Sequence, residues 1–250
     1  LRGVWQPLRL LGHLRRLYRR EAGLDLRHVN WLQNALVLPR DRVPLLTTVL
    51  GTDMQLLRLP GMTALLRRVF RRRATAICPN ADWMVPELER RFGDVAQVRF
   101  VPFGIDPCWF ELVRAPSTPA RWLCVSRITR GKIGTLFDWC APHFQDGRRE
   151  LHLFGPMQEE MTLPPWVVHH GPATPDQLCK DAFPAATGLV TLSQHAEGRP
   201  QVMLEAMAAG LPIIASDIPA HRDLLRHGET GWLCDGAEGL APAFATLEQA

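Results

Sequence analysis

The stretch that decides the fold spans residues 188–217 and reads GLVTLSQHAEGRPQVMLEAMAAGLPIIASD. It opens with a short apolar run, Gly188–Ser193, and closes with a second one, Pro212–Ser216. Between them lie a polar loop and a helix-forming segment, Pro200–Ala209, which ends at Gly210. Runs that are apolar on both faces belong in the middle of a parallel sheet. This stretch therefore predicts a strand, a crossover helix and a parallel strand.

The same alternation extends over the rest of the second half of the chain. Its sharpest local signal is Thr174-Pro175-Asp176-Gln177, which predicts a helix start with a capping box and a proline at the first helical position. The expected strands cover residues 121–126, 150–154, 167–170, 188–193, 212–216 and 232–234, and the expected helices cover 132–144, 174 onward, 200–209, 219–227 and 239–250.

In the first half, strands are expected at residues 27–31, 44–49, 75–78 and 98–101, with helices over 62–73 and 81–92. A Pro-rich stretch, residues 102–119, predicts a linker. We therefore expect an α/β protein with two Rossmann-like domains on parallel sheets, over residues 1–115 and 116–250. Because the chain lacks an initial Met and begins in helix-like sequence, the first domain is expected to be incomplete.

The composition is typical of a globular protein, with 46% hydrophobic and 22% charged residues. No apolar run approaches the roughly 20 residues of a membrane span, and no signal peptide is visible. The six cysteines form no C-x-x-C pair, so we expect buried, reduced thiols in a cytoplasmic protein. The nine histidines show no ligand spacing, and no metal site is expected.

The net charge of +4 hides an asymmetry. Residues 1–73 hold 15 arginines, no lysine and 4 acidic residues, and acidic residues outnumber basic ones in the rest. This split favours an anionic partner for the first part, although a solvated arginine-rich face is the alternative. Tyr18 and Phe70 are the aromatics within the arginine clusters, too few for a nucleic-acid surface, so we expect no nucleic-acid partner.

Residues 65–73 form a basic amphipathic pattern, LLRRVFRRR. Together with the arginines at positions 15, 16, 19 and 20, it predicts peripheral contact with an anionic membrane, at its inner face. The alternative is that Leu65, Leu66, Val69 and Phe70 pack into the first domain while the arginines are solvated.

Glu205 is the only charge on the otherwise apolar helix 200–209, which is therefore expected to be buried. A lone carboxylate there is costly unless something pairs with it. The hydroxyl groups of a ribose ligand would satisfy it, and a structural ion pair with a nearby arginine is the alternative.

Two polar loops follow strands, where ligands of open parallel sheets bind. The loop 195–200 enters the N-terminus of a helix, which favours anions, and Gly198 permits close approach of its backbone. The turn after strand 121–126 carries Arg127 and Lys132, one of two lysines in the chain. An arginine and a lysine together suit a diphosphate, although two such cations are also common on a surface.

These segments together resemble one family. Residues 197–217 closely resemble the E-x7-E hallmark of the retaining GT-B glycosyltransferases of family 4. Residues 125–132 (VSRITRGK) resemble that family's arginine-and-lysine turn, and 228–233 (GETGWL) its D-G-x-T-G-x-L segment. Residues 101–106 (VPFGID) resemble its interdomain V-P-N-G-I-D. The resemblance covers about residues 45–240.

The resemblance implies roles for the site residues. Arg127 and Lys132 would hold the diphosphate of a nucleotide-sugar donor, and Glu205 would bind the ribose. Glu197 would be the catalytic carboxylate that faces the donor sugar near the reacting carbon. The remaining donor contacts would come from Gly198, Arg199, Pro200 and Gln201.

The implied activity is transfer of a hexosyl-type sugar, with retention of its anomeric configuration, to an acceptor hydroxyl. A lipid-linked or oligosaccharide acceptor is expected, in polysaccharide or glycolipid assembly. The donor would be a co-substrate, and neither a metal nor another cofactor is expected.

The sequence departs from the family pattern at three positions. Leu50 stands where many members carry His, Phe103 replaces an Asn between the domains, and Ile133 replaces the Gly after the lysine. The family's first strand and Gly-rich loop are not visible. These departures leave a second hypothesis open, a catalytically impaired homologue that binds nucleotide-sugar as a subunit or regulator.

Overall fold

The structure is a computed structural model that describes residues 2–21 and 23–249. The chain divides into two compact units. Unit 1 comprises Leu1–Phe103 with Ala196–Arg199, and unit 2 comprises Gly104–His195 with Pro200–Ala250. Both contain a parallel sheet with helices packed on it, which confirms the predicted α/β class with two Rossmann-like parts.

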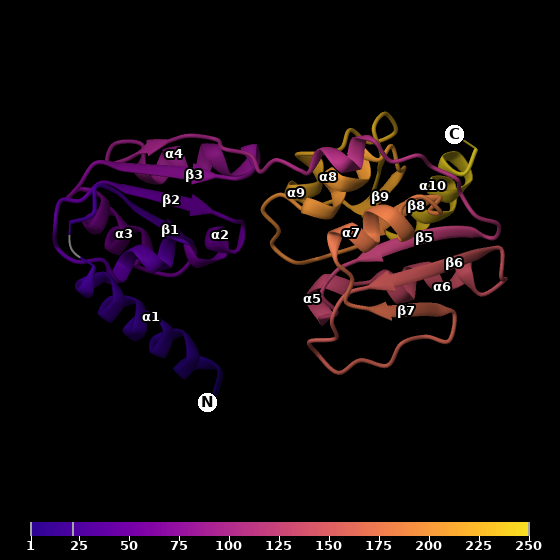
Figure 1. The fold of residues 1–250 in the computed structure, drawn as a ribbon, viewed down its shortest axis with the longest axis horizontal. Coiled ribbons are helices and arrows are strands. Elements are labelled where there is room, and N and C mark those ends of the chain that lie inside the picture. Colours follow the sequence, from indigo (N-terminus) through magenta and orange to yellow (C-terminus); the bar gives the residue numbers. More distant parts are fainter. Residues whose placement is uncertain (1, 22, 250) are drawn as a thin grey trace. The chain divides into compact units, whose positions relative to one another are not determined.

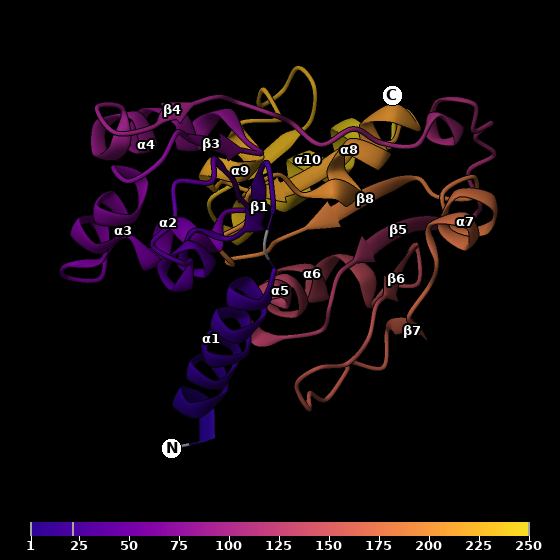
Figure 2. The ribbon, with the colours of Figure 1, turned by 60° about the vertical axis from the view of Figure 1, so that its left-hand side comes forward.

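Unit 1 is built on a parallel sheet with the strand order β1-β2-β3-β4. In both views α1 extends away from this sheet as a separate rod (Figures 1 and 2). The strands are β1 (Arg27–Asn30), β2 (Leu45–Val49), β3 (Thr75–Pro79) and β4 (Gln97–Val98). The helices are α1 (Arg2–Arg20), η1 (Leu32–Val37), α2 (Thr52–Leu56), α3 (Met62–Phe70), η2 (Asp82–Met84) and α4 (Val85–Phe92).

The core of unit 1 lies between this sheet and its helices. Leu66 and Phe70 of α3 are fully buried there, and the Phe70 ring meets that of Phe92 edge-on at 5.3 Å. Leu65 on the same helix is 54% exposed, and Val69 is half-buried. The basic amphipathic helix thus packs two of its four apolar side chains into the domain and leaves Leu65 in solvent.

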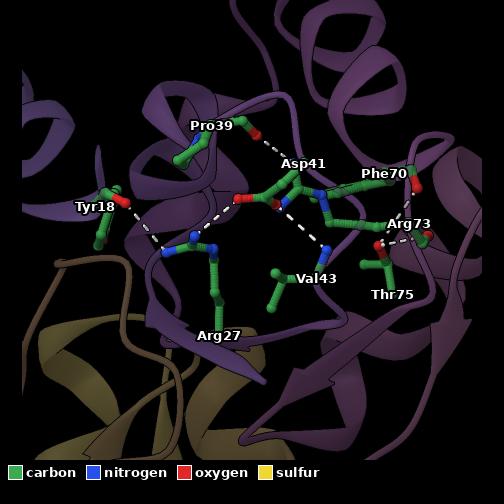
Figure 3. Close-up of polar contacts among 8 residues, drawn as sticks. All are labelled: Tyr18, Arg27, Pro39, Asp41, Val43, Phe70, Arg73 and Thr75. Atoms are coloured by element: carbon green, nitrogen blue, oxygen red, sulfur yellow. Dashed lines mark hydrogen bonds and ion pairs between the residues drawn. The ribbon is translucent and has the colours of Figure 1, made fainter. Parts of the chain in front are cut away.

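A cluster of charged side chains ties the segments of unit 1 together (Figure 3). Asp41 accepts from Arg27 at 2.8 Å and from Arg73 at 3.2 Å. The two arginine side chains are only 6% and 1% exposed. Arg73 also donates to Pro39 O at 2.6 Å, and Arg27 donates to Tyr18 O at 3.4 Å. Asp41 thus joins the start of β1 to the segment that follows α3.

Unit 2 contains a parallel sheet with the strand order β10-β9-β8-β5-β6-β7. Figure 1 shows β5, β6 and β7 side by side in that order. The strands are β5 (Ala120–Val125), β6 (Arg149–Phe154), β7 (Val167–Gly171), β8 (Gly188–Thr191), β9 (Ile213–Ser216) and β10 (Trp232–Cys234). The helices are η3 (Pro107–Phe110), α5 (Arg130–Ile133), α6 (Leu136–Phe144), α7 (Pro175–Gln177), η4 (Leu178–Ala182), α8 (Gln201–Ala208), α9 (Pro219–Arg222), η5 (Ala237–Gly239) and α10 (Leu240–Leu247).

Both faces of this sheet are covered, as its doubly apolar strands predict. On β5, Trp122 and Cys124 point into one core with α6 and α10, and Leu123 points into the other with α8 and η4. The alternation follows from the two-residue period of a strand. The predicted capping box at Thr174 is also confirmed, since its hydroxyl accepts from the backbone of Gln177 at 3.2 Å.

The structure differs from the expected elements in four places. The helix predicted over 132–144 breaks at Gly134, which has a φ of +54°. The helix predicted over 219–227 stops at Arg222, and β4 is two residues long. Helix α8 is not wholly buried, because Gln201 and Met207 face solvent. For the two helices and β4, the local apolar pattern predicted the element correctly, but tertiary packing set its boundary.

Residues 104–115 group with unit 2, whereas the sequence assigns them to the first domain. Trp109 accounts for this difference. Its side chain is 2% exposed and its ring packs on that of Phe183 at 4.7 Å within unit 2. Cys108, one residue earlier, is exposed, and Cys179 is partly exposed, so the expectation of buried cysteines fails at these two positions.

Asp41→Asn tests the charged cluster. The variant leaves Arg27 and Arg73 buried without an anion, and we expect unit 1 to lose about 3 kcal/mol of unfolding free energy. That figure is the lower end of the usual range because Asp41 is 31% exposed. Hydrogen exchange of β1–β3 peptides in urea measures it. The exposed control Asp25→Asn should change nothing, and equal effects of the two variants would contradict the assignment.

Candidate functional site

The strand order of unit 2 reverses beside β5. The chain proceeds from β5 to β6 and β7 on one side, then returns to place β8, β9 and β10 on the other. The helices that follow β5 and β8, α6 and α8, therefore pack on opposite faces of the sheet. Such a switch point is where open parallel sheets bind ligands, and two of the predicted site segments lie on it.

The first segment is the turn between β5 and α5, which carries Arg127 and Lys132. Ile128 is fully buried and donates its N–H to Pro156 O at 2.9 Å, which anchors the turn. Thr129 caps α5 by accepting from the Lys132 N–H at 3.3 Å. Arg127 is exposed and Lys132 is partly exposed, so the cations line the accessible side of a fixed turn.

The second segment is the loop from β8 to α8, and its backbone touches the first. Gln194 N donates to Gly131 O at 3.1 Å. A Cβ on Gly134 would lie 2.5 Å from Leu192 O, so only glycine allows this approach. The family pattern does not predict this role of Gly134, because the pattern has its glycine directly after the lysine, where this chain has Ile133. The contacts bring the Arg127–Lys132 turn against the loop that leads to α8.

Helix α8 contributes Glu205 to this region of unit 2. Its carboxylate is partly buried, and within the described part of the chain it has no hydrogen bond or ion pair. The alternative of an ion pair with a nearby arginine is therefore not observed among those residues. Burial raises the pKa of Glu205 from its ordinary value. Pro200 is the N-cap of α8, and the exposed Gln201 donates to Gly104 O at 3.2 Å.

Glu197, Gly198 and Arg199 group with unit 1 and not with the site residues above. Gly198 is buried and its carbonyl accepts from Trp83 Nε1 at 3.0 Å. A Cβ on Gly198 would lie 2.5 Å from Leu50 O, which explains the glycine. Glu197 and Arg199 are partly exposed.

Two residues near this segment escaped sequence reasoning. Trp83 gave no signal because its partner, Gly198, lies 115 positions away. Asp53 is 1% exposed and accepts from Leu32 N at 2.6 Å and Leu50 N at 2.8 Å. Burial raises the pKa of Asp53, and its bond to Leu50 N positions the residue that stands in place of the family's histidine.

Within residues 2–21 and 23–249, no group of three or more His, Cys, Asp or Glu side chains is arranged to hold a metal ion. The expectation that transfer needs no metal stays a prediction.

The sequence of unit 2 matches a known protein family. A family model described as Glycosyl transferases group 1 matches residues 120–249, which is nearly all of unit 2 after the linker. The chain belongs to this family. The match confirms the glycosyltransferase relationship that the E-x7-E run and the Arg127–Lys132 turn predicted, and the assignment to family 4 stays a prediction.

Two curated proteins show similarity over short segments of this group 1 chain. A phosphatidyl-myo-inositol mannosyltransferase of Mycobacterium leprae is 50% identical over 46 residues, which are 18% of this chain and 12% of that protein. The exopolysaccharide phosphotransferase SCO2592 of Streptomyces coelicolor is 40% identical over 78 residues, 29% of this chain and 8% of that protein. The matches therefore span a small part of these relatives.

Solved structures resemble the group 1 chain over most of its length. Sucrose-phosphate synthase from Thermosynechococcus elongatus has a TM-score of 0.71 and 21% identity, over 93% of this chain and 66% of that one. Alr3699/HepE from Anabaena, solved with UDP-glucose, has a TM-score of 0.72 and 17% identity, over 93% and 71%. These likenesses show the fold, which is GT-B.

Gly134→Ala tests the contact between the two loops. The variant combines strain at positive φ with a clash on Leu192 O, so we expect a loss of about 2–4 kcal/mol of unfolding free energy. Gly147→Ala is the matched control, because Gly147 has a φ of +74° but nothing within 4 Å of an added Cβ. It should lose only about 1 kcal/mol. Urea denaturation compares them, and equal losses would rule out a structural role for the contact.

Glu205→Gln tests the unpaired carboxylate. Because the folded chain raises the pKa of Glu205, ionisation opposes folding, and stability falls as the pH rises from the ordinary value of 4.5 through the raised one. The variant should therefore be more stable than the natural chain at pH 7, and the difference should vanish below about pH 4.5.

Thermal unfolding between acidic and neutral pH measures this effect. Glu160→Gln is the control, because Glu160 is exposed. A stability gain for Glu205→Gln that persists unchanged at low pH would show that the amide packs better and that the charge is irrelevant.

Proposed function

We propose that this chain is part of a retaining glycosyltransferase that moves a sugar from a nucleoside diphosphate to an acceptor hydroxyl. The observation that carries the proposal is the fixed Arg127–Lys132 turn lying against the loop that enters α8, with the unpaired carboxylate of Glu205 on that helix. Family membership supports the same conclusion. Polysaccharide or glycolipid assembly is the proposed setting.

The diphosphate is assigned to the switch point of unit 2. Arg127 offers a planar fork that suits two phosphate oxygens, and Lys132 offers a compact point charge. The first N–H groups of α8, at Gln201 and Val202, have no carbonyl partner within the helix and favour an anion. These groups stabilise the negative charge that grows on the diphosphate as the bond to the sugar breaks.

Glu205 is assigned to the nucleotide ribose. A carboxylate with no protein partner accepts hydrogen bonds from a vicinal diol, and each such bond to a charged group is worth about 1.5–3 kcal/mol. The ribose thereby compensates the cost of removing the Glu205 carboxylate from water. This explains why an expensive charge is placed on an otherwise apolar helix.

Glu197 is assigned to the donor sugar, near the reacting carbon. The neighbouring donor contacts are assigned to Gly198, Arg199, Pro200 and Gln201. In a retaining transfer the acceptor hydroxyl attacks from the side on which the diphosphate leaves, so Arg127 and Lys132 supply the positive charge in place of a metal.

A protein that binds nucleotide-sugar without turnover is the second candidate. Leu50 favours it, because an aliphatic side chain cannot replace a histidine in proton transfer or hydrogen bonding. Release of labelled sugar from its nucleotide, with and without candidate acceptors, separates the two. Binding of the nucleotide-sugar without release of the labelled sugar, with every acceptor tried, would favour a role as a subunit or regulator.

The acceptor and the location are also proposals. We assign a lipid-linked or oligosaccharide acceptor and a peripheral position on the inner face of the membrane, on the strength of the arginine-rich sequence of unit 1. Across the described residues, the helices are all too short or too polar to cross a membrane.

Lys132→Ala tests the diphosphate site. We expect it to weaken binding of nucleoside diphosphates about tenfold or more, and of nucleosides hardly at all. Calorimetric titration with UDP, GDP, ADP and their nucleosides measures this and identifies the base. The chain has one other lysine, Lys180, which is 70% exposed and pairs with Asp176, so Lys180→Ala is a matched control. Equal losses for nucleosides and diphosphates would refute a phosphate contact.

A further inference from the structure

Unit 1 contains a groove with an unusual lining, here called the arginine groove. It has a volume of about 510 Å³ and lies between α1, the η1 segment and α3. Five of its arginines come from these three places in the chain: Arg15, Arg19, Arg40, Arg68 and Arg72. The proposed donor chemistry uses none of them.

The positive charge of the groove is not neutralised by the protein. Within the described residues, none of these five arginines has an ion pair or a hydrogen bond from its side chain. Asp41 is the nearest acid in sequence to Arg40, but Arg27 and Arg73 already occupy both of its oxygens. Adjacent residues of α3 show the contrast, since Arg67 binds Asp94 through two bonds while Arg68 has no partner.

The groove is also lined by apolar side chains. Leu36 and Val37 line one side, and Leu65 and Val69 of α3 line the other. Leu65 is 54% exposed, and the other three are half-buried. Arginines that serve only to keep a protein soluble do not require exposed apolar side chains beside them in the same groove.

Helix ends explain part of the charge but not all of it. Arg19 and Arg68 lie in the last turns of α1 and α3, where cations offset the helix dipole. Arg15 and Arg40 have no such reason to be there. A second hollow shares Arg40, Arg72 and Arg73 with the groove and extends the positive surface through Arg42. Arg71 also lines it but lies 4.0 Å from Asp94.

We propose that the arginine groove binds an anionic phospholipid, with the phosphate held by guanidinium groups and part of an acyl chain on the apolar lining. Guanidinium forks match phosphate oxygens, and hydrocarbon removed from water matches Leu36, Val37, Leu65 and Val69. The continuation of positive charge beyond the groove fits a bilayer surface with many phosphates better than a single free ion. This inference makes the proposed membrane contact specific and is independent of the donor site.

The test is flotation of the whole chain with phosphatidylcholine vesicles, with and without phosphatidic acid, at low ionic strength. We expect binding only with phosphatidic acid, and release by salt. The double variant Arg68→Gln/Arg72→Gln should lose about tenfold or more in affinity, since each arginine contributes to attraction by an anionic surface. The control Arg58→Gln/Arg99→Gln removes two exposed charges of unit 1 outside the groove and should lose less than about threefold.

Two further arms separate a lipid from other phosphates. Leu65→Ser should weaken vesicle binding severalfold and leave any binding of inorganic phosphate unchanged. The proposal would be overturned in favour of free phosphate by three results together. Inorganic phosphate would saturate the chain, it would reduce vesicle binding more than sodium chloride of equal ionic strength does, and Leu65→Ser would leave vesicle binding unchanged. Equally tight binding of a DNA duplex would overturn it in favour of nucleic acid.

The remaining outcomes are also decisive. No binding to phosphatidic acid at low salt, or equal losses for the groove and control variants, would overturn the proposal. Hydrogen exchange of β1–β3 peptides in the groove variants should match that of the natural chain, which shows that unit 1 is folded. A chain that floats with lipid but binds no nucleotide would keep this inference and reject the proposed donor site.

Discussion

The reversal of strand order beside β5 is the constraint on which unit 2 depends. It sends the chain to opposite faces of the sheet after β5 and after β8, and so leaves the ends of these two strands uncovered by any crossover. Two loops meet there backbone to backbone, at Gly134 and Leu192 and at Gly131 and Gln194. The approach requires a glycine, and it holds the Arg127–Lys132 turn against the loop that leads to α8. The proposed diphosphate site depends on this contact.

Unit 1 is organised by a different constraint, the concentration of arginine in a chain segment with few acids. Asp41 resolves part of it by binding two buried arginines at once, and in doing so it links β1 to the segment after α3. The other arginines of the arginine groove lie on the surface nearby and do not pair with it.

The two units differ in how much they share with known proteins. The family match covers residues 120–249, within unit 2, where a diphosphate, a ribose and a hexose present the same chemistry in many enzymes. Of the three departures from the family pattern, Leu50 and Phe103 fall in unit 1 and Ile133 falls in unit 2. This is the expected distribution if unit 1 addresses the acceptor, because acceptors differ from enzyme to enzyme far more than nucleotide donors do. The arginine groove lies in unit 1.

The sequence by itself determined the class of the fold, most of its strands, the helix start at Thr174 and the family, because these depend on short-range periodicity and turn chemistry. It also singled out Glu205 and the Arg127–Lys132 turn. Only the tertiary structure decided that Glu205 lacks a protein partner, that Gly134 breaks a predicted helix to touch Leu192, and that Asp41 takes two arginines lying 14 and 32 residues away. The predicted domain boundary at residue 115 moved for the same reason, since Trp109 packs on Phe183. Burial, charge pairing and close backbone approach depend on which distant segments share a neighbourhood, and no local pattern carries that information.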